Sequence, residues 1–270
     1  MTASSETAGG VAKARVELPS RSAAGRKRGA YAKTEARRTE ILDAALAAFG
    51  RSGYRAGSVR EIAKLVGMSP AGMLHHFDNK ETLLAAVLEH REGIAHRVAS
   101  RHGITGLDTL VGLVELARYN STHRGIVELY CIVSAEATAA DHPAHPYFVA
   151  RYRRVRTRIA EALEHAARKG ELRAGVVPAR AARAAVALMD GLQVQWLLEP
   201  DEVDMPGELA EHFAALVKPG AWRRALAAAL APTGYEGFPD DRPGSAKNMA
   251  GPGAGNSPDA HNTPIEEVGP

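Results

Sequence analysis

The sequence predicts an all-α fold, and three features support this prediction. Hydrophobic residues make up 45% of the chain and aromatic residues only 5%, so Ala and Leu, which are good helix formers, supply most of the apolar surface. Apolar residues recur at spacings of three and four from about residue 34 to residue 231. Prolines stand between these segments or in first turns, where a helix tolerates them. No strand pattern or internal repeat stands out.

The first helix is expected to begin at Thr34. It places Ile41, Ala45 and Phe49 on one face and ends at Gly50 to Gly53. Two short helices follow, in the motif described below. The other segments with helical periodicity are 80–97, 106–119, 123–138, 146–169, 178–198, 207–217 and 221–231.

Both ends of the chain differ in composition from this helical region. Residues 1–30 are rich in Gly, Ser, Ala and Thr and end in a basic cluster, which predicts a disordered basic arm. Residues 232–270 are rich in Gly, Pro, Asn and Asp, which predicts a disordered tail. Residues 1–80 contain 14 Lys and Arg against 7 Asp and Glu, whereas the remainder contains 20 against 24. The N-terminal third is therefore the part expected to meet a polyanion.

The sequence also limits the compartment and the redox chemistry. No segment approaches the roughly 20 uncharged apolar residues that a membrane span needs, and residues 1–30 lack the apolar core of a signal peptide. We therefore expect a cytoplasmic protein with no membrane partner. Cys131 is the only cysteine, which excludes an internal disulfide, and we expect it to be a buried, inert thiol.

A helix-turn-helix is predicted between Val59 and Phe77. Ser58 and Glu61 have the spacing of a capping box, which marks the start of a short helix. We expect this helix to face inward with Ile62, Leu65 and Val66.

Gly67 follows this helix and suits the positive φ of a tight turn, and Met68 is expected to fill the inside of the turn. Ser69 and Pro70 provide an N-cap and a first-turn proline for a second helix, which reaches to about His76. In a helix-turn-helix, this second helix enters the major groove and the first lies across the phosphate backbone.

Residues 34–89 closely resemble the tetracycline-repressor (TetR) family. The residues that match this family are Ile41 to Ala45, Phe49, Gly53-Tyr54, Ser58, Ile62-Ala63, Gly67 to Ser69, His75 to Phe77 and Lys80 to Leu84. The segment Met189 to Trp196 resembles the regulatory domain of the same family. The resemblance implies an all-helical homodimer, with a three-helix head that binds DNA over residues 31–80 and a body for ligand binding and dimerisation over residues 81–231.

The resemblance also assigns DNA contacts to individual residues. Ser58, His75 and Lys80 would contact phosphates. The front of the recognition helix would approach base edges or thymine methyl groups with Ser69, Pro70, Ala71 and Gly72.

Leu74 departs from the family pattern, in which tyrosine is common and reaches DNA. Leu74 could give an apolar contact with a methyl group, so polar recognition must come from elsewhere. Arg60 and the basic arm are the candidates, and the arm would enter a flanking minor groove.

By analogy with the family, we expect the protein to be a repressor that a small-molecule effector releases from a pseudo-palindromic operator in double-stranded DNA. Its location would be the nucleoid. The candidate residues of the effector pocket are Tyr147, Phe148, Tyr152, Met189, Gln193 and Trp196, with Gln195 as a further polar candidate. Plain core packing is an equally good interpretation of each. The helices near 178–198 and 207–231 are expected to form the dimer interface through small residues, namely Ala181, Ala182, Ala184 and Ala185.

Several other interpretations stay open. His75-His76 suits phosphate contact or packing better than a shared metal, because adjacent helical residues point about 100° apart. Asp141, His142 and His145 suit a polar loop. The arginine run 151–158 suits solvated charge, with an anionic ligand or further DNA contact as alternatives.

The function classes that remain besides a sequence-specific regulator are an unrelated helical bundle, an architectural DNA-binding protein and an enzyme with a vestigial head. We find no Ser-His-Asp arrangement with a nucleophile elbow, no glycine-rich phosphate loop and no metal-ligand cluster. We therefore expect no enzyme activity, no cofactor and no metal.

Overall fold

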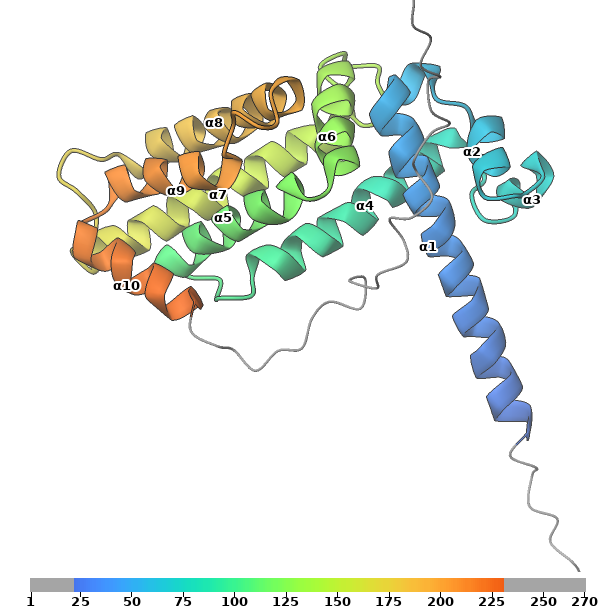
Figure 1. The fold of residues 1–270 in the computed structure, drawn as a ribbon, viewed down its shortest axis with the longest axis horizontal. Helices are drawn as coiled ribbons and strands as arrows, with labels where there is room; N and C mark the ends of the chain where they lie inside the picture. Colours follow the sequence, from blue (N-terminus) through green and yellow to red (C-terminus); the bar gives the residue numbers. More distant parts are fainter. Residues whose placement is uncertain (1–21, 231–270) are drawn as a thin grey trace, which may run out of the picture. The chain divides into compact units, whose positions relative to one another are not determined.

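The computed structural model describes the backbone of residues 22–230 and the side chains of residues 33–229. The predicted disordered tail and the first 21 residues of the predicted basic arm lie outside the described residues. Within the described range the fold is all-α, as predicted (Figure 1). A single antiparallel bridge, between Leu172 and Val217, is the only β pairing in this range.

The described chain forms ten helices. Their bounds are α1 Ser22–Ala56, α2 Val59–Leu65, α3 Pro70–Leu74, α4 Lys80–Ala99, α5 Leu107–Ser121, α6 Arg124–Glu136, α7 His145–Arg168, α8 Pro178–Leu198, α9 Met205–Leu216 and α10 Pro219–Leu230. From α4 onward these bounds follow the predicted segments closely, because apolar periodicity, prolines and glycines mark the helix ends locally.

The start of the first helix was predicted wrongly. Helix α1 begins at Ser22 rather than at Thr34, so it includes the last part of the predicted disordered arm. Residues 22–33 have no apolar stripe, but they are rich in Ala, Arg and Lys, which favour a helix without one. At its other end α1 breaks at Gly53, where φ is 74° and ψ is 176°.

Helices α1, α2 and α3 form a three-helix head, and α4 leads from the head into the helical body (Figure 1). The core of the head gathers around Phe49 on α1, Ile62 on α2, Met73 on α3 and Leu84 on α4, all at most 1% exposed. The same cluster continues into the body through Leu129 on α6. Head and body are therefore not separated by a linker.

The body packs α5, α7, α8, α9 and α10 around a second core. Its central side chains are Leu110, Ile159, Leu163, Phe213 and Val217, all fully buried. Within the body the neighbouring helix pairs include α7 with α8, α5 with α9, α4 with α5, α8 with α9, and α5 with α7. Helix α6 lies against α1, which is the largest contact between head and body.

Candidate functional site

The first helix of the motif, α2, is capped by Ser58, whose hydroxyl accepts a hydrogen bond from the backbone amide of Arg60 (3.2 Å). The prediction of a capping box between Ser58 and Glu61 is therefore wrong. Ser58 caps the helix through the amide of its second residue, Arg60. A reciprocal capping box occurs instead at the start of α4, between Asn79 and Thr82.

The turn of the motif has the predicted geometry. Gly67 adopts a φ of 63°, in the left-handed region that favours glycine. The amide of Met68 donates to the carbonyl of Ala63 (2.8 Å), and the Met68 side chain is half-buried against the core of the head. The turn is held from outside by Arg37 of α1, whose guanidinium donates to the carbonyl of Val66 (2.6 Å).

Helix α3 begins with the predicted cap, since the hydroxyl of Ser69 accepts from the amide of Gly72 (3.0 Å) and Pro70 occupies the first helical position. One face of this short helix is anchored by Met73, which is fully buried. The remaining face is open to solvent at the predicted contact residues, namely Ser69, Pro70, Ala71, Leu74 and His75, with Gly72 half-exposed.

Leu65 was predicted to face inward, and this prediction is wrong. Its side chain is 53% exposed, beside 50% for Leu74 on α3. Ile62 and Val66 already occupy the inner face of α2, and Leu65 lies one residue, about 100°, away from Val66 on a helix of only two turns. The head thus exposes two leucines, one on each helix of the motif.

Arg60 is exposed on α2, as its predicted role requires. Lys64 on α2 and Arg51 and Arg55 on α1 are exposed as well, although none of them was predicted to contact DNA. Lys80 is half-buried rather than free. Its ammonium group donates to the carbonyl of Arg55 (3.2 Å) and lies 4.4 Å from the centre of the Tyr54 ring.

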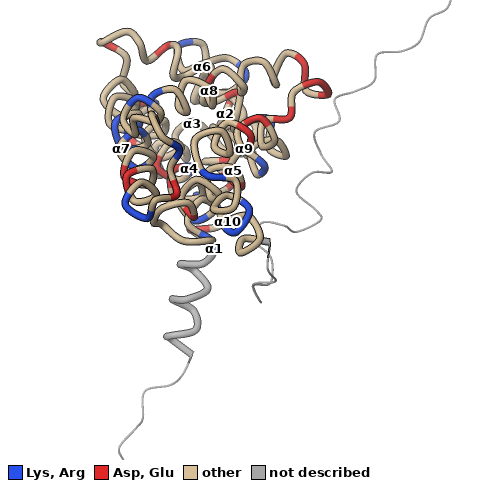
Figure 2. The backbone as a smooth tube through the Cα atoms, turned by 90° about the vertical axis from the view of Figure 1, so that its left-hand side faces the viewer, with Lys and Arg blue, Asp and Glu red and all other residues tan. Residues whose placement is uncertain are grey.

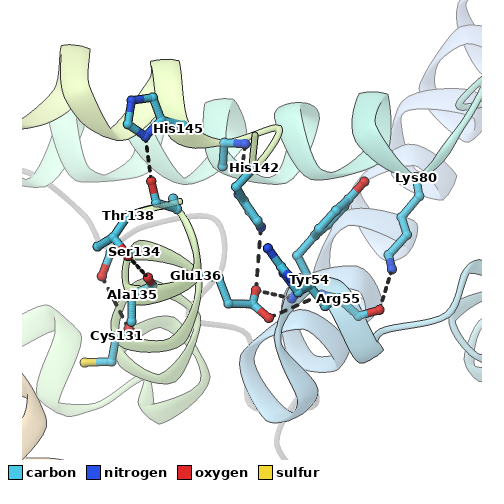
Figure 3. Close-up of polar contacts among 12 residues, drawn as sticks. Tyr54, Arg55, Lys80, Cys131, Ser134, Ala135, Glu136, Thr138, His142 and His145 are labelled. Atoms are coloured by element: carbon cyan, nitrogen blue, oxygen red, sulfur yellow. Dashed lines mark hydrogen bonds and ion pairs between the residues drawn. The ribbon is translucent and has the colours of Figure 1, made fainter. Parts of the chain in front are cut away.

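A polar cluster joins the head to the body where α1 breaks (Figure 3). The carboxylate of Glu136, at the end of α6, accepts hydrogen bonds from the backbone amides of Tyr54 (2.6 Å) and Arg55 (3.3 Å). The left-handed backbone of Gly53 brings these amides to the carboxylate, and a side chain at Gly53 would collide with Glu136. The sequence contains no local signal for this contact, which joins residues 82 positions apart.

His142 belongs to the same cluster and is buried, 4% exposed. Its Nε2 lies 3.7 Å from the carboxylate of Glu136, and its ring meets the Tyr54 ring edge-on at 5.0 Å. Burial lowers the pKa of His142 more than the nearby Glu136 raises it, so the imidazole is neutral at pH 7. Its Nδ1 accepts from the amide of Ala144 (3.1 Å), which is the role of a loop residue, as predicted.

Three adjoining cavities lie in the body. The first, of about 220 Å³, is lined by residues of α6, α7 and α8, including Tyr130, Phe148, Arg151, Asp190 and Gln193. The second, of about 70 Å³, is lined by residues of α4, α5, α7 and α8, and the third, of about 20 Å³, by residues of α5, α8 and α9. Arg151 lines the first and second cavities, Met189 the second and third, and Gln193 the first and third.

The structure places four of the six predicted pocket residues in the cavity walls. These are Phe148, Tyr152, Met189 and Gln193. Tyr147 lines none of the three cavities, and its hydroxyl donates to Glu92 (3.0 Å). Trp196 is 8% exposed and packs in a separate cluster with Val127, so it belongs to the core. Gln195 is exposed on α8 and lines none of the three cavities.

Cys131 lines the first cavity and is half-buried, less than predicted. Burial and, to a smaller extent, the charge of Asp190 raise its pKa to about 11. The thiol is therefore protonated at pH 7, which agrees with the expectation of an inert group.

Arg151 connects the cavities to α4. Its guanidinium donates to the carboxylate of Glu92 on α4 (2.8 Å) and lies 4.5 Å from the centre of the Tyr130 ring. Burial alone would raise the pKa of Glu92, but Arg151, the hydrogen bond from Tyr147 and Arg154 outweigh it and lower the pKa. The ion pair is therefore present at pH 7, with Arg151 in the walls of the first and second cavities and Glu92 in the wall of the second.

The arginine run of α7 divides between the interior and the surface. Figure 2 marks the Lys and Arg positions of α7 in blue along its backbone. Arg153 and Arg154 are exposed, whereas Arg151, Arg156 and Arg158 are half-buried. The prediction of solvated charge therefore holds for only part of the run. The other arginines of the run are half-buried because α7 packs against both α5 and α8.

The predicted dimer contacts on α8 need correction. Ala182 and Ala185 are fully buried within the chain and Ala181 is 9% exposed, so these residues allow close packing of α8 inside the body rather than between chains. Ala184 is exposed, as are Val194 (50%) and Leu198 (77%) on the same helix.

In the described part of the chain, no three His, Cys, Asp or Glu residues come together in a way that could hold a metal ion. No helix among residues 22–230 is both long and apolar enough to cross a membrane.

Comparison with protein families gives two matches. Residues 41–87 match the family of bacterial regulatory proteins described as tetR, and residues 133–219 match the C-terminal domain of BetI-type transcriptional repressors. The first match spans most of the head and the start of α4. The second spans most of the body, including the walls of the first cavity that belong to α7 and α8.

Curated relatives agree with these matches. The repressor Rv1474c of Mycobacterium tuberculosis is 38% identical over 72 residues, and KstR2 of Rhodococcus jostii is 37% identical over 82 residues; each match covers 27% of this chain. The chain spans about two fifths of the length of these two relatives, 38% and 40%. The regulator TtgR of Pseudomonas putida is 28% identical over 190 residues, which cover 64% of this chain and 85% of TtgR.

Solved structures with the same fold include two with bound small molecules. A transcriptional regulator from Saccharomonospora viridis in complex with choline is 28% identical, with a TM-score of 0.58 over 68% of this chain and 99% of that one. The SmeT–triclosan complex is 25% identical, with a TM-score of 0.58 over 76% of this chain and 100% of that one.

Proposed function

Because the chain belongs to the tetR family of bacterial regulatory proteins, we propose that it is a sequence-specific DNA-binding transcriptional regulator, a repressor that a small-molecule effector releases from its operator. DNA binding is assigned to residues 31–80, and effector binding and dimerisation to residues 81–231. The observation that supports DNA binding most directly is the outer face of α3, the second helix of the helix-turn-helix. This face exposes Pro70, Ala71, Leu74 and His75 to solvent.

The surroundings of α3 support contact with a polyanion. Arg51, Arg55, Arg60 and Lys64 are exposed on α1 and α2, so their charges can meet phosphates on either side of the groove. Ser58 and Lys80 would add phosphate contacts at the ends of α2 and α4. Since Lys80 also bonds to the carbonyl of Arg55, such a contact would fix the end of α1 as well.

Effector release is supported by the route from the cavities to the head. A ligand in the cavities would meet Phe148, Tyr152, Met189 or Gln193. Arg151, in the same walls, is bonded to Glu92 of α4, and α4 leads directly to the head. A ligand that binds better when α4 is displaced would shift the population away from the DNA-binding form, by no more than its difference in affinity for the two forms.

The protein would act as a homodimer that reads two half-sites of a pseudo-palindrome. The exposed apolar residues Val194 and Leu198 of α8 support an interface on this helix, because they share one helix face and a dimer contact would remove both side chains from water.

The experiment that tests the proposal is selection of genomic DNA fragments by the purified full-length protein, followed by titration of the selected site and of a scrambled copy at rising salt. We expect a pseudo-palindromic site that binds at least a thousandfold more tightly than its scrambled copy. Equal affinity for both sequences, with the same salt dependence, would instead identify an architectural DNA-binding protein.

A further inference from the structure

Arg91 of α4 is a buried cation with two nitrogens that lack a hydrogen-bond partner. Its side chain is 2% exposed. One terminal nitrogen donates to the side-chain oxygen of Asn120 (3.2 Å), and the guanidinium carbon lies 5.5 Å from the centre of the Tyr119 ring. Nε and Nη1 have no partner in the described part of the chain. The amide of Asn120 and the ring of Tyr119 are neutral, so neither supplies a counter-charge.

The carboxylate of the adjacent residue, Glu92, is already occupied. It accepts hydrogen bonds from Tyr147 and Arg151 and a longer one from Arg154. Burial lowers the pKa of Arg91, but a guanidinium keeps its proton in proteins. A buried guanidinium with two unsatisfied nitrogens destabilises a fold, so Arg91 calls for an acceptor that the described residues do not supply.

Arg91 is not itself in the walls of the second and third cavities, but its neighbours on α4 and its partner on α5 are. Ala95 follows Arg91 by one turn of α4 and lines the second cavity. Leu116 precedes Asn120 by one turn of α5 and lines the second and third cavities, and Asn120 itself lines the third. Residues four apart share one face of a helix, so Arg91 and Asn120 lie on the side of these cavities toward the head.

The rest of the second and third cavities is mostly apolar, with walls that include Leu113, Ile159, Met189 and Leu192. A second guanidinium, that of Arg158, lines the second cavity and also has a buried nitrogen without a partner among the described residues. Apolar walls that hold the unpaired nitrogen of Arg158 and end near those of Arg91 fit a ligand that is apolar along most of its length and anionic at one end.

We propose that the effector is an apolar molecule with a single carboxylate and that Arg91 binds this carboxylate. The inference rests on the proposed function, because it names the chemical class of that effector. The ligand supplies the counter-charge that Arg91 lacks. Since Arg91 is on α4, the new ion pair acts on the helix that leads to the head. Asp190 in the first cavity would favour a cation instead, and the test separates the two.

The test uses the full-length protein without DNA and three probes of equal chain length, octanoate, octanamide and octylammonium. Isothermal titration and thermal unfolding measure their binding. We expect octanoate to bind at least tenfold more tightly than octanamide and to raise the melting temperature, and octylammonium not to bind. Failure of octanoate to bind, equal binding of octanamide or preferred binding of octylammonium overturns the proposal.

Variants at Arg91 then locate the carboxylate. Arg91→Met is expected to weaken octanoate binding at least tenfold, whereas the matched control Arg153→Met, on the exposed face of α7, leaves it unchanged. If Arg91→Met fails to fold, Arg91→Lys provides the answer, with octanoate still preferred over octanamide but bound at least threefold more weakly. Unchanged octanoate affinity in either Arg91 variant contradicts the proposal.

A separate operator titration distinguishes this inference from the proposed function. Octanoate that binds through Arg91 without weakening operator binding would refute effector release and leave the carboxylate site standing. If the protein does not bind octanoate but another compound releases it from the operator, the carboxylate site is refuted and effector release stands.

Discussion

The carboxylate of Glu136 accepts the backbone amide hydrogen of Tyr54 at 2.6 Å, across the contact between α6 of the body and α1 of the head. The same carboxylate takes the amide of Arg55 at 3.3 Å. Because the φ and ψ of Gly53 are non-helical, these two amides follow a break in α1, and Glu136 accepts hydrogen bonds from both. A side chain of the body thus completes a helix end of the head.

This relationship predicts the effect of Glu136→Ala. Loss of the carboxylate leaves the Tyr54 amide without its partner, which should lower the free energy of unfolding by about 1–3 kcal/mol and weaken operator binding, since the head is held less firmly. Urea unfolding and operator titration measure the two effects. Glu136→Gln keeps one acceptor oxygen and should lose less, and Glu164→Ala, exposed on α7, should change little. A Glu136→Ala protein with unchanged stability and affinity would show that the contact is incidental.

Gly67→Val should disrupt the turn of the motif. A side chain at Gly67 meets no atom within 4 Å, so the cost comes from the backbone φ of 63° alone. For a β-branched residue we expect a loss of more than about 1 kcal/mol and no operator binding. Gly67→Asn, which tolerates this conformation better, is the matched control and should retain part of the binding. Full activity of Gly67→Val would refute the turn assignment.

Leu74 is expected to contribute to recognition and little to folding, because its side chain is 50% exposed on α3. Leu74→Ala should change the melting temperature only slightly but weaken operator binding by about 1 kcal/mol, or fivefold, if the leucine covers a thymine methyl group. Replacing that thymine by uracil should cost the wild-type protein as much and the variant nothing. Independent losses from the two changes would rule out the methyl contact.

Stability should fall as the pH drops below neutrality, because of His142. In the folded protein, burial lowers the pKa of its imidazole, and the charge of Arg55 lowers it further. The charges of Glu136 and Asp141 raise this pKa, but the net shift is downward. The unfolded chain therefore takes up a proton near the usual value of 6.5 before the folded chain does, so stability present above that pH is lost as the pH falls through and below it.

The measurement is urea unfolding at pH 7 and pH 5. His142→Asn should reduce the loss between the two pH values, though not abolish it, because burial also lowers the pKa of His212. An identical loss in wild type and His142→Asn would assign the effect to other groups.

Much of the head followed from local sequence. The cap at Ser69, the proline at position 70 and the positive φ of Gly67 are decided by residues within a few positions of each other, so their pattern predicts them. The prediction for Leu65 failed because inward and outward faces differ by one residue on a helix of two turns, and the packing partner decides between them. The early start of α1 was missed because it rests on helix propensity without apolar periodicity.

The sequence by itself determined the all-α fold, the positions of most helices and the helix-turn-helix, because caps, turns and periodicity act over one or two turns of chain. Tertiary structure alone decided that Glu136 meets Tyr54, that Arg91 is buried without a counter-charge, and which predicted pocket residues line a cavity. These features depend on which helices pack together, and the contacts join residues 29 positions apart for Arg91 and Asn120 and 82 for Glu136 and Tyr54. A local sequence pattern carries no information about partners so far away in the chain.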